Sequence, residues 1–244
     1  MALLKVQELD KSFGALIVTD SVSLEVAAGE AVGILGPNGA GKSTLFALIA
    51  GTLRPSGGTV CWRGRDVSAL PASRRCRLGM GRSFQIPHPF VGMSVYENLL
   101  VAASFGDRRG ASVQGRCRDI LAQTGLAAKA DMPAGALGLL ERKRLELARA
   151  MATNPALLLL DEIAGGLTRA ECDALVALIR DLKAQGIAIL WIEHVLHALT
   201  QVVDRVLVLD RGRLIADGPP DAVLARADVR EIYLGGSTDA AAAA

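Results

Sequence analysis

Histidine and cysteine are scarce in this sequence of 244 residues, which contains three of the former and four of the latter. The cysteines are Cys61, Cys76, Cys117 and Cys172, and none of them belongs to a C-x-x-C pair. A zinc site needs clustered ligands of these two types, and a disulfide framework needs closer spacing in a smaller chain. The sequence therefore predicts free thiols in a reducing compartment.

Long apolar runs and an excess of one charge are also missing. The longest candidate run, Ile187 to Ile192, is far shorter than the roughly 18 residues of a membrane span. Lys and Arg number 27 against 25 Asp and Glu, so the net charge of +2 does not support a nucleic-acid-binding protein. Lys5, Glu8 and Asp10 stand where a signal peptide needs apolar residues, so we expect no export signal.

The composition is that of a folded protein with alternating strands and helices. Hydrophobic residues make up 51% and charged residues 21%, which excludes a disordered chain. Apolar and polar residues alternate over the first 35 positions, as in half-buried strands, except that 31–35 is continuously apolar, as in a strand buried on both faces. We expect a short helix at 43–51 and a further strand at 59–64.

The middle of the chain has helical patterns. Ser94 and Glu97 form a capping-box pair ahead of an apolar run, which predicts a helix over 96–105. A second helix is expected near 113–125, so that 87–136 is typical of a helical insertion, and 141–151 is strongly helical.

A buried strand, a helix and another buried strand follow in the last third. The strand at 156–161 precedes the capping-box pair Thr168 and Glu171, a helix over 169–185 and a strand at 187–192. This βαβ order predicts a sheet that is at least partly parallel. Two more short strands are expected at 205–210 and 212–217, followed by helical turns.

The most specific motif is the glycine-rich turn GPNGAGKST, which fits G-x4-G-K-S/T and lies between a buried strand and a helix. Glycines let the chain wrap tightly, so that backbone N–H groups reach phosphate oxygens. Lys42 supplies a charge for the β- and γ-phosphates, and Ser43 offers a hydroxyl to Mg²⁺. The motif predicts a P-loop (Walker A) whose nucleotide-binding residues are Gly36, Pro37, Asn38, Gly39, Ala40, Gly41, Lys42, Ser43 and Thr44.

A pair of acids ends the buried strand LLLLDE. Asp161 is the predicted partner of the metal held by Ser43, and Glu162 is placed to orient or deprotonate the attacking water. The fold class predicted is α/β: a P-loop NTPase with a mixed, largely parallel sheet, an N-terminal antiparallel β subdomain and an inserted helical subdomain. We expect an ATPase domain over 1–234, with a core at 1–86 and 155–234 and the helical subdomain at 87–154, followed by a disordered tail at 235–244.

With these motifs in place, the sequence resembles the ATP-binding subunits of ABC transporters over nearly its whole length. The P-loop, LLLLDE, Gln85 in RSFQ and His194 in WIEHV come in the family's order and spacing. It looks most like the branched-chain amino acid uptake branch, through the segments KSFGALIVTDSVSLEV, GRSFQIP, SVYENLLVA and KRLELARAM. The resemblance implies that Phe13 stacks on adenine, that Gln85 meets Mg²⁺ or the attacking water, and that His194 contacts the γ-phosphate.

The sequence departs from the family at its signature, which reads LSGGQ, or LSYGQ in this branch. The serine hydroxyl is missing, a glycine is replaced by leucine and an amide by a carboxylate; the positions are Leu137, Gly138, Leu139, Leu140 and Glu141. Ile163 also replaces a proline, and Thr168 an Asn or Asp. The resemblance implies that a signature serves the ATP of the opposite subunit. Losing one hydrogen bond to a phosphate costs about 1.5–3 kcal/mol, so we expect slower turnover rather than none.

The resemblance implies an ATPase that powers uptake of branched-chain or other hydrophobic amino acids, with ATP and Mg²⁺ as cofactors. The implied partners are transmembrane permease subunits, a second ATP-binding subunit, identical or not, and indirectly a periplasmic solute-binding protein, but no nucleic acid. The expected location is peripheral, on the cytoplasmic side of the cell membrane.

Two alternatives stay open. The altered signature also suits a regulatory nucleotide-binding subunit with little turnover, although Glu162 and His194 favour hydrolysis. An ATPase for lipid or lipopolysaccharide export shares much of this sequence. GTPase and small-molecule kinase functions are disfavoured because no N-K-x-D motif exists and no lid-like arginine cluster is suitably placed. We expect Arg74, Arg75 and Arg77 on a solvated face.

Overall fold

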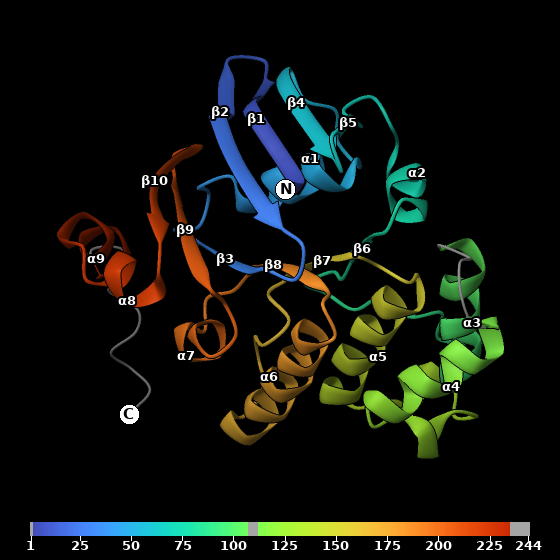
Figure 1. Ribbon diagram of the computed structural model, residues 1–244. Helices are drawn as coiled ribbons and strands as arrows, with labels where there is room; N and C mark the ends of the chain where they lie inside the picture. The colour runs from blue at the N-terminus through green and yellow to red at the C-terminus, as the bar shows by residue number, and fades with distance from the viewer. Residues whose placement is uncertain (1, 107–111, 235–244) are drawn as a thin grey trace.

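Two sheets form the centre of the protein, with helices packed around them (Figure 1). The computed structural model describes residues 2–106 and 112–234, so the predicted tail at 235–244 lies outside the described residues. One sheet has four strands in the order β2-β1-β4-β5, and the other has six in the order β10-β9-β3-β8-β7-β6. No helix of this described part combines the length and the apolar character that crossing a bilayer requires.

The four-stranded sheet is antiparallel, and only one of its two faces is buried. It contains β1 (Ala2–Phe13), β2 (Leu16–Ala27), β4 (Gly57–Trp62) and β5 (Arg65–Asp66). The predicted alternation is confirmed, since Leu4, Val6 and Leu9 are buried while Lys5 and Gln7 are not. The buried face packs on helix α1 (Lys42–Ala50), whose other side meets β3 in the same apolar cluster. Because α1 lies between two sheets, it is apolar all round.

The six-stranded sheet is mixed, as predicted. Its parallel strands are β6 (Met80–Arg82), β7 (Leu157–Asp161), β8 (Ala188–Ile192), β3 (Ala31–Leu35) and β9 (Arg205–Asp210), and β10 (Arg213–Gly218) is antiparallel to β9. Every residue of β3, β7 and β8 is buried, which confirms the meaning of the continuous apolar runs. The carboxyl ends of the parallel strands meet at one edge, where such sheets place their ligands.

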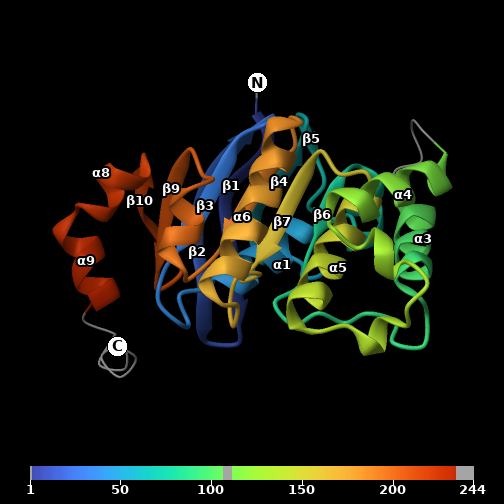
Figure 2. The ribbon, with the colours of Figure 1, turned by 90° about the horizontal axis from the view of Figure 1, so that it is seen from below.

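Three helices gather at one side of the six-stranded sheet (Figure 2). They are α3 (Val95–Phe105), α4 (Val113–Gln123) and α5 (Leu139–Ala152), with two 3-10 turns between α4 and α5. The capping box that opens α3 is confirmed, because Ser94 N–H donates to Glu97 Oε2 at 2.7 Å and Glu97 N–H donates to Ser94 Oγ at 3.1 Å. The subdomain boundaries remain predictions.

The last third follows the expected order. Helix α6 (Arg169–Ala184) begins at the predicted capping box of Thr168 and Glu171. The remaining helices are short: α7 (Leu196–Thr200), α8 (Pro220–Leu224) and α9 (Ala227–Leu234). Sequence patterns missed α2 (Ala72–Arg77) and β6, because six and three residues carry too little periodicity to detect.

The expectation of a solvated arginine face is wrong for one of its three residues. Arg74 and Arg77 are exposed, but Arg75 is only 1% exposed. Its Nη1 donates to the carbonyls of Leu48 and Ile49, both at 2.7 Å, in the last turn of α1. A helix leaves its last carbonyls without partners, and α2 brings a guanidinium to them. Arg75 therefore fixes the far end of the helix that follows the P-loop.

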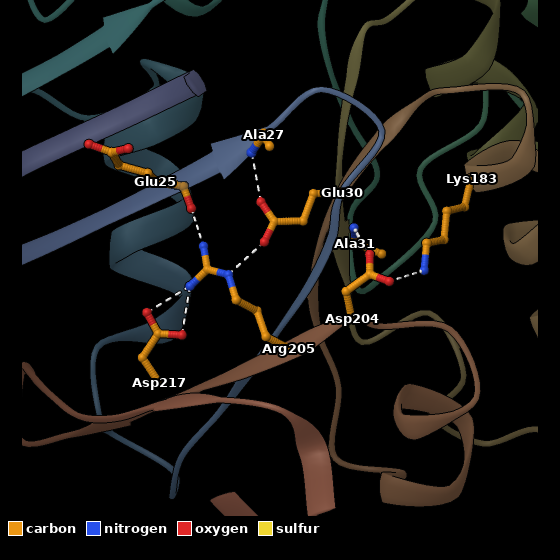
Figure 3. A network of polar contacts seen from close by, with 8 residues as sticks. All are labelled: Glu25, Ala27, Glu30, Ala31, Lys183, Asp204, Arg205 and Asp217. Carbon is orange, nitrogen blue, oxygen red and sulfur yellow. Dashed lines mark hydrogen bonds and ion pairs between the residues drawn. The ribbon is translucent and has the colours of Figure 1, made fainter. Parts of the chain in front are cut away.

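A second arginine joins the two sheets at the amino end of β9 (Figure 3). The Arg205 guanidinium donates from Nε to Glu30 at 2.6 Å and from Nη1 to both carboxylate oxygens of Asp217 at 2.7 Å. It also donates to the backbone carbonyl of Glu25 in β2. A planar guanidinium that donates from three nitrogens to three different partners fixes orientation as well as distance.

A neighbouring carboxylate makes a similar link. Asp204 accepts a hydrogen bond from the Ala31 N–H at 2.9 Å and pairs with Lys183 of α6 at 2.7 Å (Figure 3). Both contacts lie at the amino ends of β3 and β9, at the opposite edge of the sheet from the predicted site. Asp204 therefore has a structural role, away from the predicted site.

Candidate functional site

The predicted site residues follow the carboxyl ends of four adjacent strands. The P-loop comes after β3, Gln85 lies three residues beyond β6, Asp161 and Glu162 end β7, and His194 is two residues beyond β8. These strands are neighbours in the order β3-β8-β7-β6, so the fold brings the four segments to one edge. Their arrangement there decides what chemistry the site can support.

Two glycines fix the shape of the P-loop. A Cβ on Gly36 would lie 2.1 Å from the Leu209 carbonyl oxygen, and one on Gly41 would lie 2.5 Å from the Val18 carbonyl oxygen. Gly41 also has a φ of 101°, a conformation that side chains disfavour. In contrast, a Cβ on Gly39 would meet nothing within 4 Å. Neighbouring backbone therefore packs closely against the loop at Gly36 and Gly41, while the space beside Gly39 is open.

The Lys42 ammonium lies inside the loop. The side chain is 6% exposed, and its Nζ donates to the carbonyls of Gly36 at 2.6 Å and Pro37 at 3.0 Å. Burial lowers the pKa of Lys42, and the charges of Glu162 and Asp161 oppose that shift. A cation held at the amino end of α1, beside glycine backbone, is a cradle suited to a chain of phosphates.

Asp161 is buried at the end of β7 and faces an arginine. Arg82 Nη2 of β6 lies 3.2 Å from its Oδ2. Burial raises the pKa of Asp161, while the Arg82 charge opposes that shift. The carboxylate of Asp161, the exposed hydroxyl of Ser43 and the amide of Gln85 are hard oxygen donors, and this donor set fits Mg²⁺.

Glu162 brings three of the predicted catalytic residues together. Gln85 Nε2 donates to its Oε2 at 2.5 Å, and His194 Nε2 lies 2.6 Å from its Oε1. The Glu162 backbone has a φ of 47°, the left-handed region that a non-glycine residue rarely adopts. Such strain concentrates at functional sites, and here it aims the carboxylate out of the strand between its two partners.

Phe13 is available for stacking. It ends β1 with 52% of its surface exposed, and the Lys11 Nζ lies 5.0 Å from its ring centroid. Its partner across the hairpin is Leu16, two residues before the Val18 carbonyl that packs on Gly41. The hairpin that carries Phe13 therefore adjoins the P-loop, and the ring is not part of the sheet core.

The divergent signature forms the amino end of α5. Gly138 is the N-cap, and its N–H donates to Glu141 Oε2 at 3.0 Å, so Glu141 replaces a capping side chain. Glu141 is also paired with Lys129, and that hydrogen bond, more than the one from Gly138, lowers the pKa of the carboxyl. Leu137 is buried, Leu139 is 52% exposed and Leu140 is half-buried. The helix end thus presents leucines and a capped carboxylate.

Two site residues were not predicted. Arg82 is the first residue of the RSFQ segment, but no role was predicted for it, and its contact with Asp161 is seen only in the structure. Glu193 is 1% exposed, and its carboxylate accepts hydrogen bonds from the backbone N–H groups of Ala164 and His194, both at 2.9 Å. An acid directly before His194 at the end of an apolar strand was a signal in the sequence that could have revealed it.

Comparisons with known proteins find relatives of this chain over nearly its full length. A family model described as ABC transporter matches residues 19–165, and one described as Branched-chain amino acid ATP-binding cassette transporter matches residues 213–239. The lipopolysaccharide export ATP-binding protein LptB of Acidithiobacillus ferridurans is 37% identical, covering 96% of this chain and 97% of its own. The high-affinity branched-chain amino acid transport ATP-binding protein LivG of Salmonella typhimurium is 36% identical, covering 96% and 98%.

A solved structure has the same fold. The ADP conformation of MJ1267, an ATP-binding cassette of an ABC transporter, superposes with a TM-score of 0.88 and 31% identity, covering 96% of this chain and 99% of that one. The predicted α/β P-loop NTPase fold is therefore confirmed. With relatives above 30% identity over nearly the full length, the chain belongs to the ATP-binding subunits of ABC transporters, a family of ATPases.

Proposed function

We propose that the chain binds Mg·ATP at the carboxyl edge of the six-stranded sheet and hydrolyses it there. Residues 36–44 and the Lys42 ammonium hold the phosphates, and the Phe13 ring stacks on the adenine. Ser43, Asp161 and Gln85 hold Mg²⁺, which when bound withdraws charge from the phosphate oxygens. The buried Lys42 ammonium, already wrapped by the loop, supports this assignment.

Glu162 is the proposed general base. It takes the proton of the attacking water, while Gln85 orients the water and His194 contacts the γ-phosphate. The observation that carries this proposal is the position of the Glu162 carboxylate, which lies within 2.6 Å of both the Gln85 amide and the His194 imidazole. Two partners on opposite oxygens fix the carboxylate in one orientation, as a base requires.

We propose that the transport direction is import, with branched-chain or other hydrophobic amino acids as the solutes. This proposal is supported by the similarity to LivG, which covers 96% of this chain, and by the match of residues 213–239 to a model described as Branched-chain amino acid ATP-binding cassette transporter. Lipopolysaccharide or lipid export is the second candidate, since LptB is 37% identical. A regulatory subunit with little turnover is a third, supported only by the altered signature.

The proposed assembly contains transmembrane permease subunits, a second ATP-binding subunit that meets the amino end of α5, and indirectly a periplasmic solute-binding protein. It places this chain peripherally on the cytoplasmic side of the membrane. The ATPase domain proposed is 1–234, with the core at 1–86 and 155–234 and the helical subdomain at 87–154.

Calorimetry and turnover test the proposed chemistry. The full chain is expected to bind Mg·ATP with heat that disappears in Lys42→Met, and to lose turnover but not binding in Glu162→Gln. Turnover that is insensitive to Glu162→Gln would refute the base assignment. Copurification with permease subunits, followed by leucine uptake into vesicles made with the complex, separates import from export of a lipid.

A further inference from the structure

The buried carboxylate of Glu193 joins the two loops that carry the proposed catalytic pair. Its Oε2 accepts a hydrogen bond from the Ala164 N–H at 2.9 Å, two residues after Glu162. Its Oε1 accepts hydrogen bonds from the N–H groups of His194 at 2.9 Å and Val195 at 3.2 Å. One side chain thus ties the loop after β7 to the loop after β8, with three backbone donors.

These bonds act on a strained turn. Glu162 has a φ of 47°, a strained conformation that a non-glycine residue keeps only when its surroundings hold it. Before the turn, the Glu162 N–H donates to the Ile192 carbonyl at 2.8 Å; after it, the Ala164 N–H donates to Glu193. Ile192, the last residue of β8, and Glu193, which follows it, therefore hold the turn from both sides, and only the bond to Glu193 depends on a side chain.

Helix α5 supplies a buried positive charge on which this carboxylate acts. Lys143 is buried, and the charges that act on its ammonium are those of Glu193 and then Glu162. Burial lowers the pKa of Lys143, and both carboxylates oppose that shift. A buried carboxylate is stable when backbone donors and a nearby cation compensate it, and Glu193 has both.

We propose that Glu193 is a positioning residue for ATP hydrolysis: it sets the distance between the Glu162 carboxylate and the His194 imidazole by holding both loops. The proposal rests on the proposed function, because it takes Glu162 and His194 as the catalytic pair. Glu193 itself is closed off from solvent and acts through backbone N–H groups. Its loss therefore affects the reaction rather than the binding of nucleotide.

Steady-state kinetics and calorimetry on the full chain test this role. Glu193→Ala is expected to lower kcat roughly 100-fold, since misplacing a catalytic group by about 1 Å has an effect of that size. The Kd for Mg·ATP should stay within about twofold. Glu193→Gln keeps one acceptor oxygen but places an amide NH₂ beside a backbone donor, so its kcat should lie between those of the native chain and Glu193→Ala. It replaces Glu193→Ala as the test if that variant does not fold.

Asp204→Asn is the matched control. Asp204 also accepts a backbone N–H bond and pairs with a lysine, but at the far edge of the sheet. The Asp204→Asn substitution should lower the melting temperature and leave kcat unchanged. Equal losses of kcat in the Asp204 and Glu193 variants would show that stability alone explains the effect, and the positioning role would be overturned.

A second measurement does not depend on turnover. In NMR spectra with ¹³C-labelled histidine, Glu162→Gln should shift the His194 imidazole resonance, because the two side chains are in contact. In the Glu193→Ala background, the same substitution should no longer shift it. A shift of the same size in both backgrounds would overturn the proposal. The NMR measurement can be made even if the isolated chain hydrolyses ATP slowly.

The double variant Glu193→Ala/His194→Ala separates this proposal from the one it rests on. If Glu193 acts by setting the distance between Glu162 and His194, its loss should cost less in the His194→Ala background than in the native chain, so the double variant should keep more kcat than the product of the two single losses predicts. Multiplied losses would overturn the positioning role while leaving the catalytic pair intact. Full activity in Glu162→Gln would instead reject the proposed function, whatever Glu193 does.

Discussion

The carboxylate of Glu162 and the imidazole of His194 lie in hydrogen-bond contact, 2.6 Å between Oε1 and Nε2, although 32 residues separate them in the chain. Parallel pairing of β7 with β8 produces this contact, because Asp161 is in register with Ile192, Glu162 follows Asp161 directly and His194 lies two residues beyond Ile192. The relation between the two residues is thus set by sheet register and is sensitive to anything that changes the loops beyond it.

His194 should be essential for turnover. We expect His194→Ala to lower kcat by at least about 100-fold with little change in ATP affinity, since a positioned proton-transfer or phosphate-contacting group contributes on that scale. Steady-state kinetics with calorimetry checks this. His197→Ala is the control, because His197 is exposed in α7 and contacts Asp173 instead, at 3.3 Å. An equal loss of kcat in both variants would contradict the role of His194.

Restoring the missing hydroxyl of the signature should speed turnover. Gly138 has a φ of −70°, and its Cβ would lie no closer than 3.8 Å to Glu141, so Gly138→Ser fits without strain. Its hydroxyl could cap α5 and reach the opposite ATP, and the expected gain in kcat is about tenfold. Gly138→Ala adds the carbon without the oxygen. The same kcat in the two variants would argue against a role for the hydroxyl.

Burial of Glu146 should make stability fall as pH rises. Glu146 lies in α5, and burial raises its pKa above the ordinary 4.5, with the Arg149 charge opposing. A carboxyl whose folded pKa is raised contributes stability fully below its unfolded pKa and loses it as pH rises through the folded value. The native chain should therefore lose stability relative to Glu146→Gln in urea unfolding as the pH rises above the ordinary carboxyl pKa of 4.5.

Glu171 serves as a control, because the pH dependence of stability expected from it has the opposite sign. Hydrogen bonds from the Thr168 hydroxyl and then the Thr168 N–H lower the pKa of Glu171 at the start of α6. A depressed pKa gives stability that is present above the unfolded pKa and lost as pH falls. Relative to Glu171→Gln, the native chain should gain stability as pH rises. Parallel pH profiles for the Glu146 and Glu171 variants would contradict both assignments.

The Arg205 network should matter for stability and not for catalysis. Arg205→Lys keeps the charge but cannot bond Glu30, Asp217 and the Glu25 carbonyl together, and we expect it to cost about 1–3 kcal/mol in the free energy of unfolding. Arg213→Lys, at the exposed pair with Asp20, should cost less than about 1 kcal/mol. Urea unfolding compares the two, and a change in kcat would contradict a purely structural role.

Much of this site was predictable because its parts are local patterns. The continuous apolar runs of β3, β7 and β8 marked strands buried on both faces, and the P-loop and LLLLDE follow directly on two of them. Parallel strands place their carboxyl ends together, so the meeting of Lys42, Asp161 and Glu162 follows from the order of elements. The membership of Gln85 and His194 in the site was expected only through family resemblance, and their contacts with Glu162 were not predicted.

The parts that escaped prediction depend on contacts between distant segments. Arg75 is buried because α2 happens to face the end of α1, 26 residues earlier in the chain, and nothing near it in the sequence marks that neighbour. Arg82 is defined by Asp161 across β6 and β7 in the same way. A charged residue looks solvated by default, and only the tertiary structure reveals the partner that permits its burial.

Helix α5 connects regions that are otherwise separate. Its 14 residues span about 20 Å. Glu141 lies in the first turn, and the charge of Glu193 acts on Lys143 in the second. Near the other end, the Arg149 guanidinium lies 5.3 Å from the Phe90 ring centroid. An uninterrupted helix tilts as a stiff rod. A displacement of the surface around Phe90 would therefore move the signature and the carboxyl edge of the six-stranded sheet at the same time, without side-chain rearrangements in between.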